Sequence, residues 1–475
     1  MYAATSQIYG DIKTTLKDGR QPASRLSVQS PRSVEKLEGT CRNEEVVSGC
    51  RATAECEKEN GTFNIEQIGS VMLDEGKKSI TINRRSALKL AGGAAVAGFG
   101  VRGFPAPAVA QGAPLRVGVM LPFTGTYGAL GKTIENAFKQ YIAEHGDKLG
   151  GRTIEFVQVD DQAEPAKGTD NMNKLVSRDN VDVVVGTVHS GVQMAMIKIA
   201  RETGKLMIIP NAGADIATRA QCAPNIFRTS FSNWQPSYPL GKVLMDAGHK
   251  NAIILTWKYA AGEEHANAFK EGYIKLGGKI DAEFYVPFPE VEFQSYLTQI
   301  AEKRPSAVFT FMAGGGAVKL VKDYAAAGLG KSIPLYGSGF LTDGTLQAQG
   351  EAAEGLQTTL HYADDLDNPA EKAFRANFKK LYNGEPDVYA VQGYDAAALL
   401  DVGLTAVKGD INAKDSLYKA MESAKLNSPR GPMTFSASHN PVQNIYLREV
   451  RKGKNVKIGI AYEALADPGT GCKMI

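Results

Sequence analysis

The stretch Val117-Gly118-Val119-Met120-Leu121-Pro122-Phe123-Thr124-Gly125 is a short apolar run that ends in a proline and a glycine. Runs of this length and composition are typical of buried strands, and Pro and Gly mark the turns that end them. An amphipathic segment at 128–146 follows directly. A buried strand that leads straight into a helix is the repeating unit of parallel sheets, so this stretch predicts an α/β fold.

The same strand–helix unit recurs on the C-terminal side of this stretch. Apolar runs rich in β-branched and aromatic residues predict strands at 115–121, 153–160, 181–187, 205–210, 251–257, 281–287, 306–312 and 333–336. Amphipathic segments predict helices near 128–146, 165–179, 191–203, 235–248, 262–277, 292–303 and 315–328. Right-handed crossovers place the loops that follow the strands at one edge of a sheet, where ligands of open α/β sheets bind.

The alternation of strands and helices changes after residue 355. We expect successive helices near 369–383, 389–408 and 413–424, and then a hairpin of 443–451 with 454–461. The candidate connections between two lobes are the polar linkers Arg228–Pro236, Gln357–Asp367 and Phe435–Pro441.

Length and charge limit the classes of partner. The chain has 475 residues, enough for two or three domains, and 22% of them are charged. Residues 1–110 hold 15 Lys/Arg and 12 Asp/Glu, and the rest of the chain holds 39 of each. Nucleic-acid binding needs clustered positive charge, and so does adhesion to anionic lipid. A formally neutral body therefore argues against both partners.

Residues 84–110 have the pattern of an export signal. Arg84-Arg85 precedes an apolar run, Leu90–Val101, and the segment ends in Ala108-Val109-Ala110 before Gln111. The paired arginines resemble the twin-arginine signal, from which Asn83 and Ala87 depart, so export is predicted more firmly than its route. A run of about twelve residues is too short to span a bilayer. The alternative is a buried helix of the mature protein.

The extension at residues 1–83 is polar and lacks sustained periodicity. Either it is disordered, or the true start is Met72, which would give the signal an ordinary length. Its Cys41, Cys50 and Cys56 do not have the spacing of a zinc site, and the six histidines of the chain are scattered. We therefore predict no metal and no cofactor.

Several segments together resemble the receptors typified by the leucine/isoleucine/valine-binding protein. Val117–Gly125, continued by Tyr127-Gly128, is similar to the opening of that family. Val183–Gly191 and Met207–Ala214 are similar to two further strands with their ligand loops. The three crossovers between lobes are matched by Asn225–Thr229, Gly355–Thr359 and Gly431–Phe435. These matches keep the family's order over residues 115–460.

This resemblance implies the type I periplasmic binding fold, with two Rossmann-like lobes of parallel sheet joined by three hinge segments. Lobe 1 would comprise 111–229 and 358–436, and lobe 2 would comprise 230–357 and 437–475. Such a receptor is a periplasmic monomer and not an enzyme. It closes on a ligand held between its lobes and delivers it to the permease and ATPase subunits of an ABC importer.

One pair of loops suits a carboxylate. Ser190-Gly191 follows a strand and opens a helix, where a hydroxyl and free backbone N–H groups favour an anionic oxygen. In the family this loop and the one at 211–214 hold the ligand's carboxylate. The alternative for Ser190 is an ordinary helix N-cap, a role compatible with binding.

The amine end departs from the pattern of amino-acid receptors, which place an acidic residue after the strand at 333–336. This chain reads Tyr336-Gly337-Ser338-Gly339-Phe340, with no acidic residue before Asp343. Burying an ammonium without a charged partner costs several kcal/mol, more than about half of the ~8 kcal/mol of a micromolar complex. A zwitterionic ligand is therefore disfavoured unless another carboxylate, Asp395 above all, reaches the site.

Aromatic residues occur at the loops instead. Such rings suit an aromatic acid, although core or interface packing is the alternative for each, Trp257 in particular. Thr187–Gly191 together with Trp257–Gly262 is similar to the subgroup that takes up benzoate- or cinnamate-like acids. The candidate ligand-binding residues are Tyr127, His189, Ser190, Gly191, Asn211, Ala212, Gly213, Ala214, Tyr259, Ala313, Gly314, Ser338 and Phe340.

Cys222 and Cys472 are the only cysteines after residue 110. In an oxidising periplasm an even pair predicts one disulfide, and two free thiols are the alternative.

Two other functions stay open: a receptor of the same fold for branched-chain or other amino acids, and a sensor that signals to a partner. Catalysis by Ser190 is disfavoured because no G-x-S-x-G turn surrounds it.

Overall fold

The computed structural model describes residues 113–475. The extension at 1–83, the signal at 84–110 and the cleavage site before Gln111 lie outside the described residues, as do Cys41, Cys50 and Cys56. Among the described helices, none combines the length and the apolar character that a membrane crossing requires.

The first sheet has six strands in the order β2-β3-β1-β4-β5-β6, and all of its pairs are parallel except β2 with β3. Its strands are β1 (Leu115–Leu121), β2 (Lys148–Leu149), β3 (Arg152–Asp160), β4 (Val183–Gly186), β5 (Leu206–Ile209) and β6 (Ile226–Arg228). The helices between them are α1 (Gly128–Glu144), α2 (Pro165–Asn173) and α3 (Ser190–Thr203). Their apolar residues are buried, as the sequence pattern predicts for a sheet covered by helices.

The second sheet has eight strands in the order β12-β13-β11-β10-β9-β7-β8, with β14 paired to β13. Its strands are β7 (Asn251–Lys258), β8 (Lys279–Pro287), β9 (Ala307–Phe311), β10 (Leu335–Ser338), β11 (Gln357–Leu360), β12 (Thr434–Phe435), β13 (Pro441–Arg451) and β14 (Lys454–Leu465). Its helices are α4 (Trp234–Asp246), α5 (Ala260–Lys275), α6 (Gln294–Lys303), α7 (Gly314–Ala326) and α8 (Leu346–Gln349). The parallel part follows the predicted βα alternation, and the C-terminal hairpin adds antiparallel strands.

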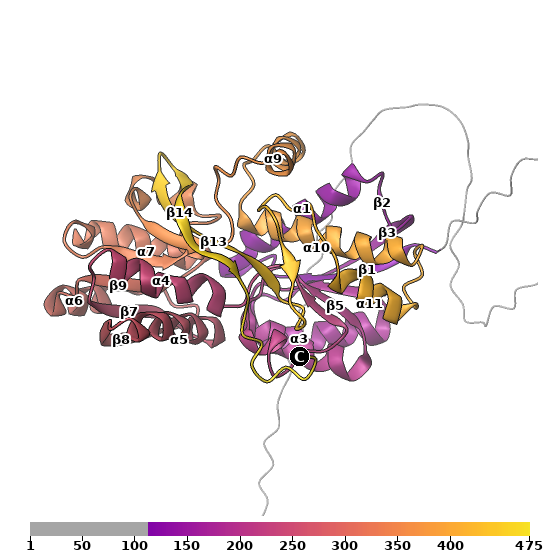
Figure 1. Cartoon of the computed structure of the whole chain (residues 1–475), viewed down its shortest axis with the longest axis horizontal. Helices are drawn as coiled ribbons and strands as arrows, with labels where there is room; N and C mark the ends of the chain where they lie inside the picture. Colours follow the sequence, from indigo (N-terminus) through magenta and orange to yellow (C-terminus); the bar gives the residue numbers. More distant parts are fainter. Residues whose placement is uncertain (1–112) are drawn as a thin grey trace, which may run out of the picture. The chain divides into compact units, whose positions relative to one another are not determined.

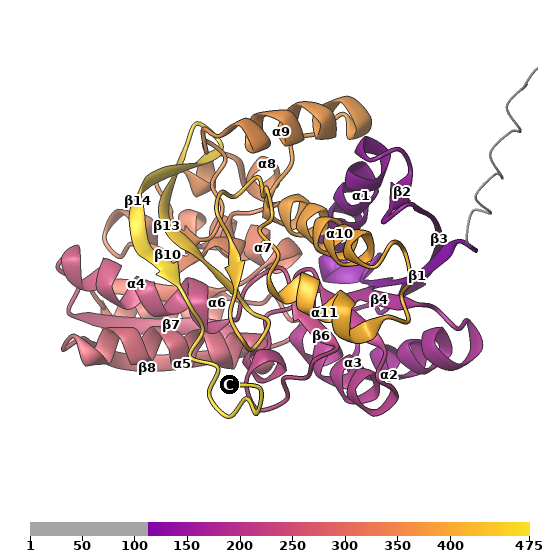
Figure 2. The same cartoon turned by 45° about the vertical axis from the view of Figure 1, so that its right-hand side comes forward.

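Three late helices lie between β11 and β12 in the chain: α9 (Pro369–Tyr382), α10 (Val388–Ala406) and α11 (Lys414–Glu422). In Figures 1 and 2 the orange α10 lies beside the purple α1, far from it in sequence. The two helices approach closely at Gly393, where the absence of a side chain permits the contact. A Cβ at this position would lie 2.2 Å from the carbonyl oxygen of Ile134. Helix α10 is apolar on nearly all sides and almost wholly buried, so it belongs to the core of the first lobe.

The chain passes between the sheets after β6, after β11 and before β12. Strand β11 ends at Leu360 and pairs with β10 and β13, so its residues 358–360 belong to the second sheet. The short β12 also pairs with β13. The lobe boundaries expected at 358 and 436 therefore fall a few residues from the observed changes of sheet.

Candidate functional site

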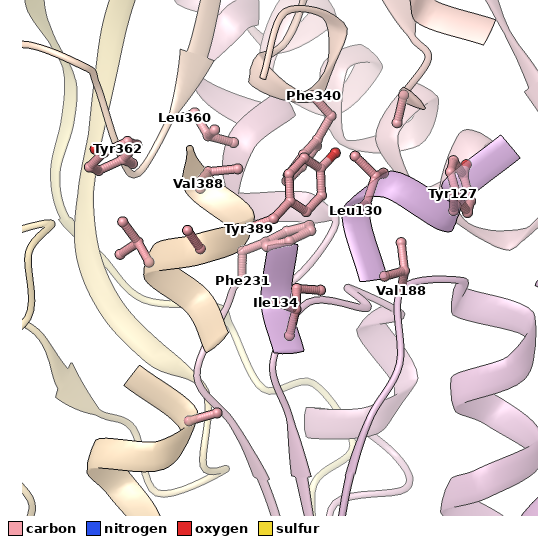
Figure 3. Packing of buried hydrophobic residues seen from close by; sticks show 14 of the residues in the cluster. Tyr127, Leu130, Ile134, Val188, Phe231, Phe340, Leu360, Tyr362, Val388 and Tyr389 are labelled. Atoms are coloured by element: carbon pink, nitrogen blue, oxygen red, sulfur yellow. The ribbon is translucent and has the colours of Figure 1, made fainter. Parts of the chain in front are cut away.

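The loops after several strands of both sheets meet around a narrow cavity of about 20 Å³, which is room for about one water molecule. The lobes are thus in contact across it. Thirteen residues line the cavity: Tyr127, Val188, Ser190, Asn211, Gly213, Phe231, Asn233, Tyr259, Ala261, Phe311, Ala313, Phe340 and Tyr389. Figure 3 shows part of this wall, with Phe340 and Tyr389 close to Phe231.

Seven of the predicted site residues line the cavity: Tyr127, Ser190, Asn211, Gly213, Tyr259, Ala313 and Phe340. The other six lie in the same loops but not on its wall: His189, Gly191, Ala212, Ala214, Gly314 and Ser338. Sequence reasoning missed Val188, Phe231, Asn233, Ala261, Phe311 and Tyr389. Phe231 and Asn233 lie in a linker that was assigned only a hinge role. Tyr389 is the second residue of a helix that carries no binding motif.

His189, rather than Ser190, is the N-cap of α3. Its Nδ1 accepts hydrogen bonds from the backbone N–H groups of Gly191 (3.1 Å) and Val192 (3.3 Å). Burial lowers the pKa of His189 to about 4, so the ring is neutral and can accept. It also stacks on Tyr259, with ring centroids 4.5 Å apart. The N-cap alternative for Ser190 is therefore wrong, and its hydroxyl is not used to cap the helix.

Ser190 is the first residue of α3, and its hydroxyl faces the cavity with a proton to donate. Its Oγ accepts a hydrogen bond from Asn233 Nδ2 at 3.2 Å. Gly213 leaves room for the side chains of Asn233 and Phe231. A Cβ at Gly213 would lie 2.2 Å from Asn233 Oδ1 and 2.5 Å from the ring of Phe231. A hydroxyl donor and a tight glycine loop form a site suited to a small anion. The dipole of α3 favours negative charge there, although His189 already accepts from its first N–H groups.

Two helices of the second lobe also begin at the cavity. Ala261 lies in the first turn of α5, and Ala313 is the N-cap of α7. Neither helix has a side-chain hydrogen bond at its N-cap, so backbone N–H groups of their first turns remain available. With α3, three helices begin at the cavity, and the dipole at each N-terminus favours negative charge there without a cationic side chain.

No Asp, Glu, Lys or Arg occurs among the described residues that line the cavity. Asp343, the first acidic residue after β10, forms an ion pair with Arg448 at 2.5 Å. Asp395 forms an ion pair with Arg430 at 2.6 Å. All four side chains are buried, and both carboxylates are engaged away from the cavity wall. None of the described lining residues thus supplies a carboxylate that could neutralise an ammonium group.

The two lobes share a hydrogen bond across the cavity between Tyr127 Oη and Tyr259 Oη, 2.8 Å apart. Burial raises the pKa of both phenols above the ordinary value, so both stay neutral. Trp257 lies edge-on to Tyr127, is fully buried and donates from Nε1 to the carbonyl of Glu290, so it packs in the core behind the wall.

Comparison with known proteins identifies the family that has this architecture. The model of a family described as periplasmic binding protein matches residues 114–455. Leu/Ile/Val-binding protein homolog 6 of Brucella melitensis is 32% identical, over 75% of this chain and 93% of its own length. The chain belongs to this periplasmic binding protein family. It is a solute-binding protein of the ABC-transporter type, related to the Leu/Ile/Val-binding proteins.

Two solved structures of solute-binding proteins are especially similar to this periplasmic binding protein. One, from R. palustris and in complex with benzoate, is 52% identical, with a TM-score of 0.75 over 76% of this chain and 100% of the other. The second, from Rhodopseudomonas palustris BisB5 with 3,4-dihydroxybenzoic acid, is 34% identical, with a TM-score of 0.71 over 75% and 99%. The predicted family and fold class are thereby confirmed.

Next to the cavity, this binding protein holds two carboxyl groups from opposite lobes, a buried one at Asp215 and a partly buried one at Glu264. Glu264 Oε2 accepts from Asn233 Nδ2 at 2.7 Å and from the backbone N–H of Asp215 at 3.1 Å. Burial, together with repulsion from Glu264, raises the pKa of Asp215 to about 8, although Arg219 lies 3.1 Å from its carboxylate. Closure of the lobes thus brings together two groups that compete for one proton.

The C-terminal tail of the binding protein returns to the first lobe. Cys472 is joined to Cys222 in a disulfide, with Cα atoms 5.5 Å apart. Asp467 pairs with Arg219 through two hydrogen bonds of 3.0 and 2.8 Å. Within residues 113–475, no cluster of three or more His, Cys, Asp or Glu side chains could hold a metal ion.

Proposed function

We propose that this chain is the substrate-capturing subunit of an ABC importer for a small aromatic carboxylate. The observation that carries the proposal is the cavity, which is lined by aromatic and small residues, contains no charged side chain and receives three helix N-termini. Such a site offers neutral donors to a carboxylate and flat apolar walls to a ring. Because the cavity has room for only about one water molecule, the lobes would have to move apart slightly to admit the ring. The benzoate and dihydroxybenzoate complexes of the similar proteins support it.

The carboxylate would accept hydrogen bonds from Ser190 and from the backbone of the 211–214 loop at Asn211 or Gly213. The N–H groups of Ala212 and Ala214 already donate to Thr187 and Gln193. The ring would lie among Phe231, Tyr259 and Phe340, which come from the first crossover and from the second lobe. Because these groups surround the ligand only when the lobes are closed, binding favours the closed form. The permease and ATPase subunits would then receive a closed, monomeric receptor.

The name of the Brucella relatives favours a second candidate, a receptor for branched-chain amino acids. An amino acid brings an ammonium group as well as a carboxylate. Transferring that ammonium into this cavity would leave it without a charged partner, at a cost of several kcal/mol. We therefore rank an aromatic carboxylate above an amino acid.

A thermal-shift series would test the assignment of the ligand class. Benzoate, 4-hydroxybenzoate, 3-phenylpropanoate, leucine and phenylalanine would be compared at equal concentration. We expect at least one aromatic carboxylate to raise the melting temperature and the amino acids to leave it unchanged. A ligand at 100 times its Kd stabilises a protein by about 2.7 kcal/mol. The pair of 3-phenylpropanoate and phenylalanine isolates the ammonium group. A shift with leucine and none with any aromatic acid would contradict the proposal.

We also propose that the receptor works in the periplasm and begins at Gln111 after removal of residues 84–110 by export. The paired arginines and the Ala-x-Ala pattern support this. N-terminal sequencing of the exported protein checks it, and retention of residues 84–110 would contradict it.

A further inference from the structure

Tyr389 is a cavity-lining residue for which the interactions described so far provide no role. It is the second residue of α10, and its side chain is 1% exposed. Its ring lies 6.0 Å from that of Phe340, between centroids. Figure 3 shows the side chain extending from α10 toward Phe340 and Leu130, above Phe231.

The hydroxyl of Tyr389 is buried and has no hydrogen-bond partner among the residues that the structure describes. The other polar side chains on the cavity wall all have one. Tyr127 and Tyr259 bond to each other, Ser190 accepts from Asn233, and Asn211 donates to Gln392 at 2.7 Å. Buried hydroxyl groups are almost always hydrogen-bonded, and an unsatisfied one is costly. Tyr389 is therefore the single lining side chain that still requires a polar partner.

We propose that Tyr389 determines specificity by forming a hydrogen bond with a ring hydroxyl of the ligand, so that this receptor binds a hydroxybenzoate more tightly than benzoate. The inference rests on the proposed function, because it presupposes that the cavity holds an aromatic carboxylate. It assigns the two ends of the ligand to different walls: the carboxylate to Ser190 and the ring hydroxyl to Tyr389.

The surroundings of Tyr389 disfavour the opposite orientation. Burial, followed by the nearby carboxylates of Asp343 and Asp387, raises the pKa of Tyr389 well above its ordinary value. The phenol therefore keeps its proton and can donate. A ligand carboxylate at this wall would meet no cationic side chain among the described lining residues, since Arg448 is already paired with Asp343. A neutral ring hydroxyl can both accept from Tyr389 and donate, and it needs no cation.

The test is a matrix of ligands and variants measured by isothermal titration calorimetry on the full exported protein. The ligands are benzoate and 2-, 3- and 4-hydroxybenzoate. The variants are wild type, Tyr389→Phe, Ser190→Ala and the matched control Tyr336→Phe. The hydroxyl of Tyr336 faces His249 at 3.3 Å and lies outside the cavity wall. Melting temperatures without ligand verify that each variant is folded.

We expect wild type to bind at least one hydroxybenzoate about tenfold or more tightly than benzoate, because that ligand satisfies a buried group which benzoate leaves unpaired. Tyr389→Phe should abolish the preference and leave benzoate binding unchanged or slightly tighter. Ser190→Ala should weaken all four ligands by a similar factor, and Tyr336→Phe should change none.

Equal or tighter binding of benzoate by wild type would overturn the inference. So would a Tyr389→Phe variant that weakens benzoate and the hydroxybenzoates equally, since Tyr389 would then hold the carboxylate. Both outcomes leave the proposed function intact. Failure of all four benzoates to bind would overturn the proposed function, and this inference with it.

Discussion

The cavity wall and the hinge region beside it differ in whether they contain charged side chains. The described part of the wall has no charged side chain, whereas Arg228, Arg430 and Arg448 are fully buried around the crossovers. Each of these arginines makes several hydrogen bonds, and Arg430 and Arg448 also form ion pairs, so most of the cost of burying these charges is compensated. Charge thus holds the hinge together, whereas under the proposed function the ligand would be selected by shape and by neutral hydrogen-bond donors.

Arg430 illustrates the hinge side of this comparison. It forms an ion pair with Asp395 of α10 and donates to the carbonyls of Thr229 (2.8 Å) and Ser230 (3.2 Å) in the first crossover. One side chain therefore connects the core of the first lobe with two crossings of the chain.

The largest effect is expected from Arg430→Met. The substitution leaves Asp395 buried without a charged partner, with only the hydrogen bond from Ser428, and should lower the free energy of unfolding by about 3–5 kcal/mol. Urea unfolding followed by circular dichroism measures this. The double variant Arg430→Met with Asp395→Leu should recover part of the loss, because both charges are then absent. A single variant as stable as wild type would show that the charged hinge contributes little.

Ser190→Ala, at the cavity wall, should weaken ligand binding and leave the stability of the fold nearly unchanged. Loss of a hydrogen bond to a charged carboxylate should weaken binding by about 1–3 kcal/mol. The free energy of unfolding should change little, because His189 caps the helix and Ser190 does not. Calorimetric titration with the best aromatic ligand, alongside urea unfolding, separates the two quantities. Destabilisation without weaker binding would assign Ser190 a structural role instead.

The smallest effect concerns the carboxyl pair between the two regions. Because the pKa of Asp215 is raised to about 8 in the folded protein, folding retains a proton that the unfolded chain releases. This group therefore makes the free energy of unfolding fall as pH rises from about 4 to about 8. Glu264→Gln removes the repulsion and should flatten the fall by on the order of 1 kcal/mol. Urea unfolding between pH 5 and 8 measures the difference, and identical slopes for the two proteins would contradict it.

The fold could be predicted because apolar runs such as Val183–Gly186 occur in a regular alternation that only parallel sheets explain. Tyr127, Ser190 and Tyr259 could be found because each closely follows a strand, and that edge binds ligands. Tyr389 could not be found in this way. It reaches the cavity from a helix of the last third of the chain, and that placement depends on the packing of α10 against α1.

The N-cap of α3 was missed for a more local reason. Serine is the commoner capping residue, and a helix start one residue earlier puts His189 in that role. Asn233 was missed because a residue of a crossover was assigned only to the hinge, although its amide links Ser190 to Glu264. The role of His189 thus depends on a helix boundary shifted by one residue, and the role of Asn233 depends on contacts with segments distant in sequence.

The most direct test of the uncharged cavity compares benzoate, 4-hydroxybenzoate and leucine by calorimetric titration of the exported protein in one buffer. The structure predicts binding of at least one of the two aromatic acids in the micromolar range or tighter, and no measurable binding of leucine. Micromolar binding of leucine, with neither aromatic acid bound, would contradict the conclusion that this cavity excludes an ammonium group.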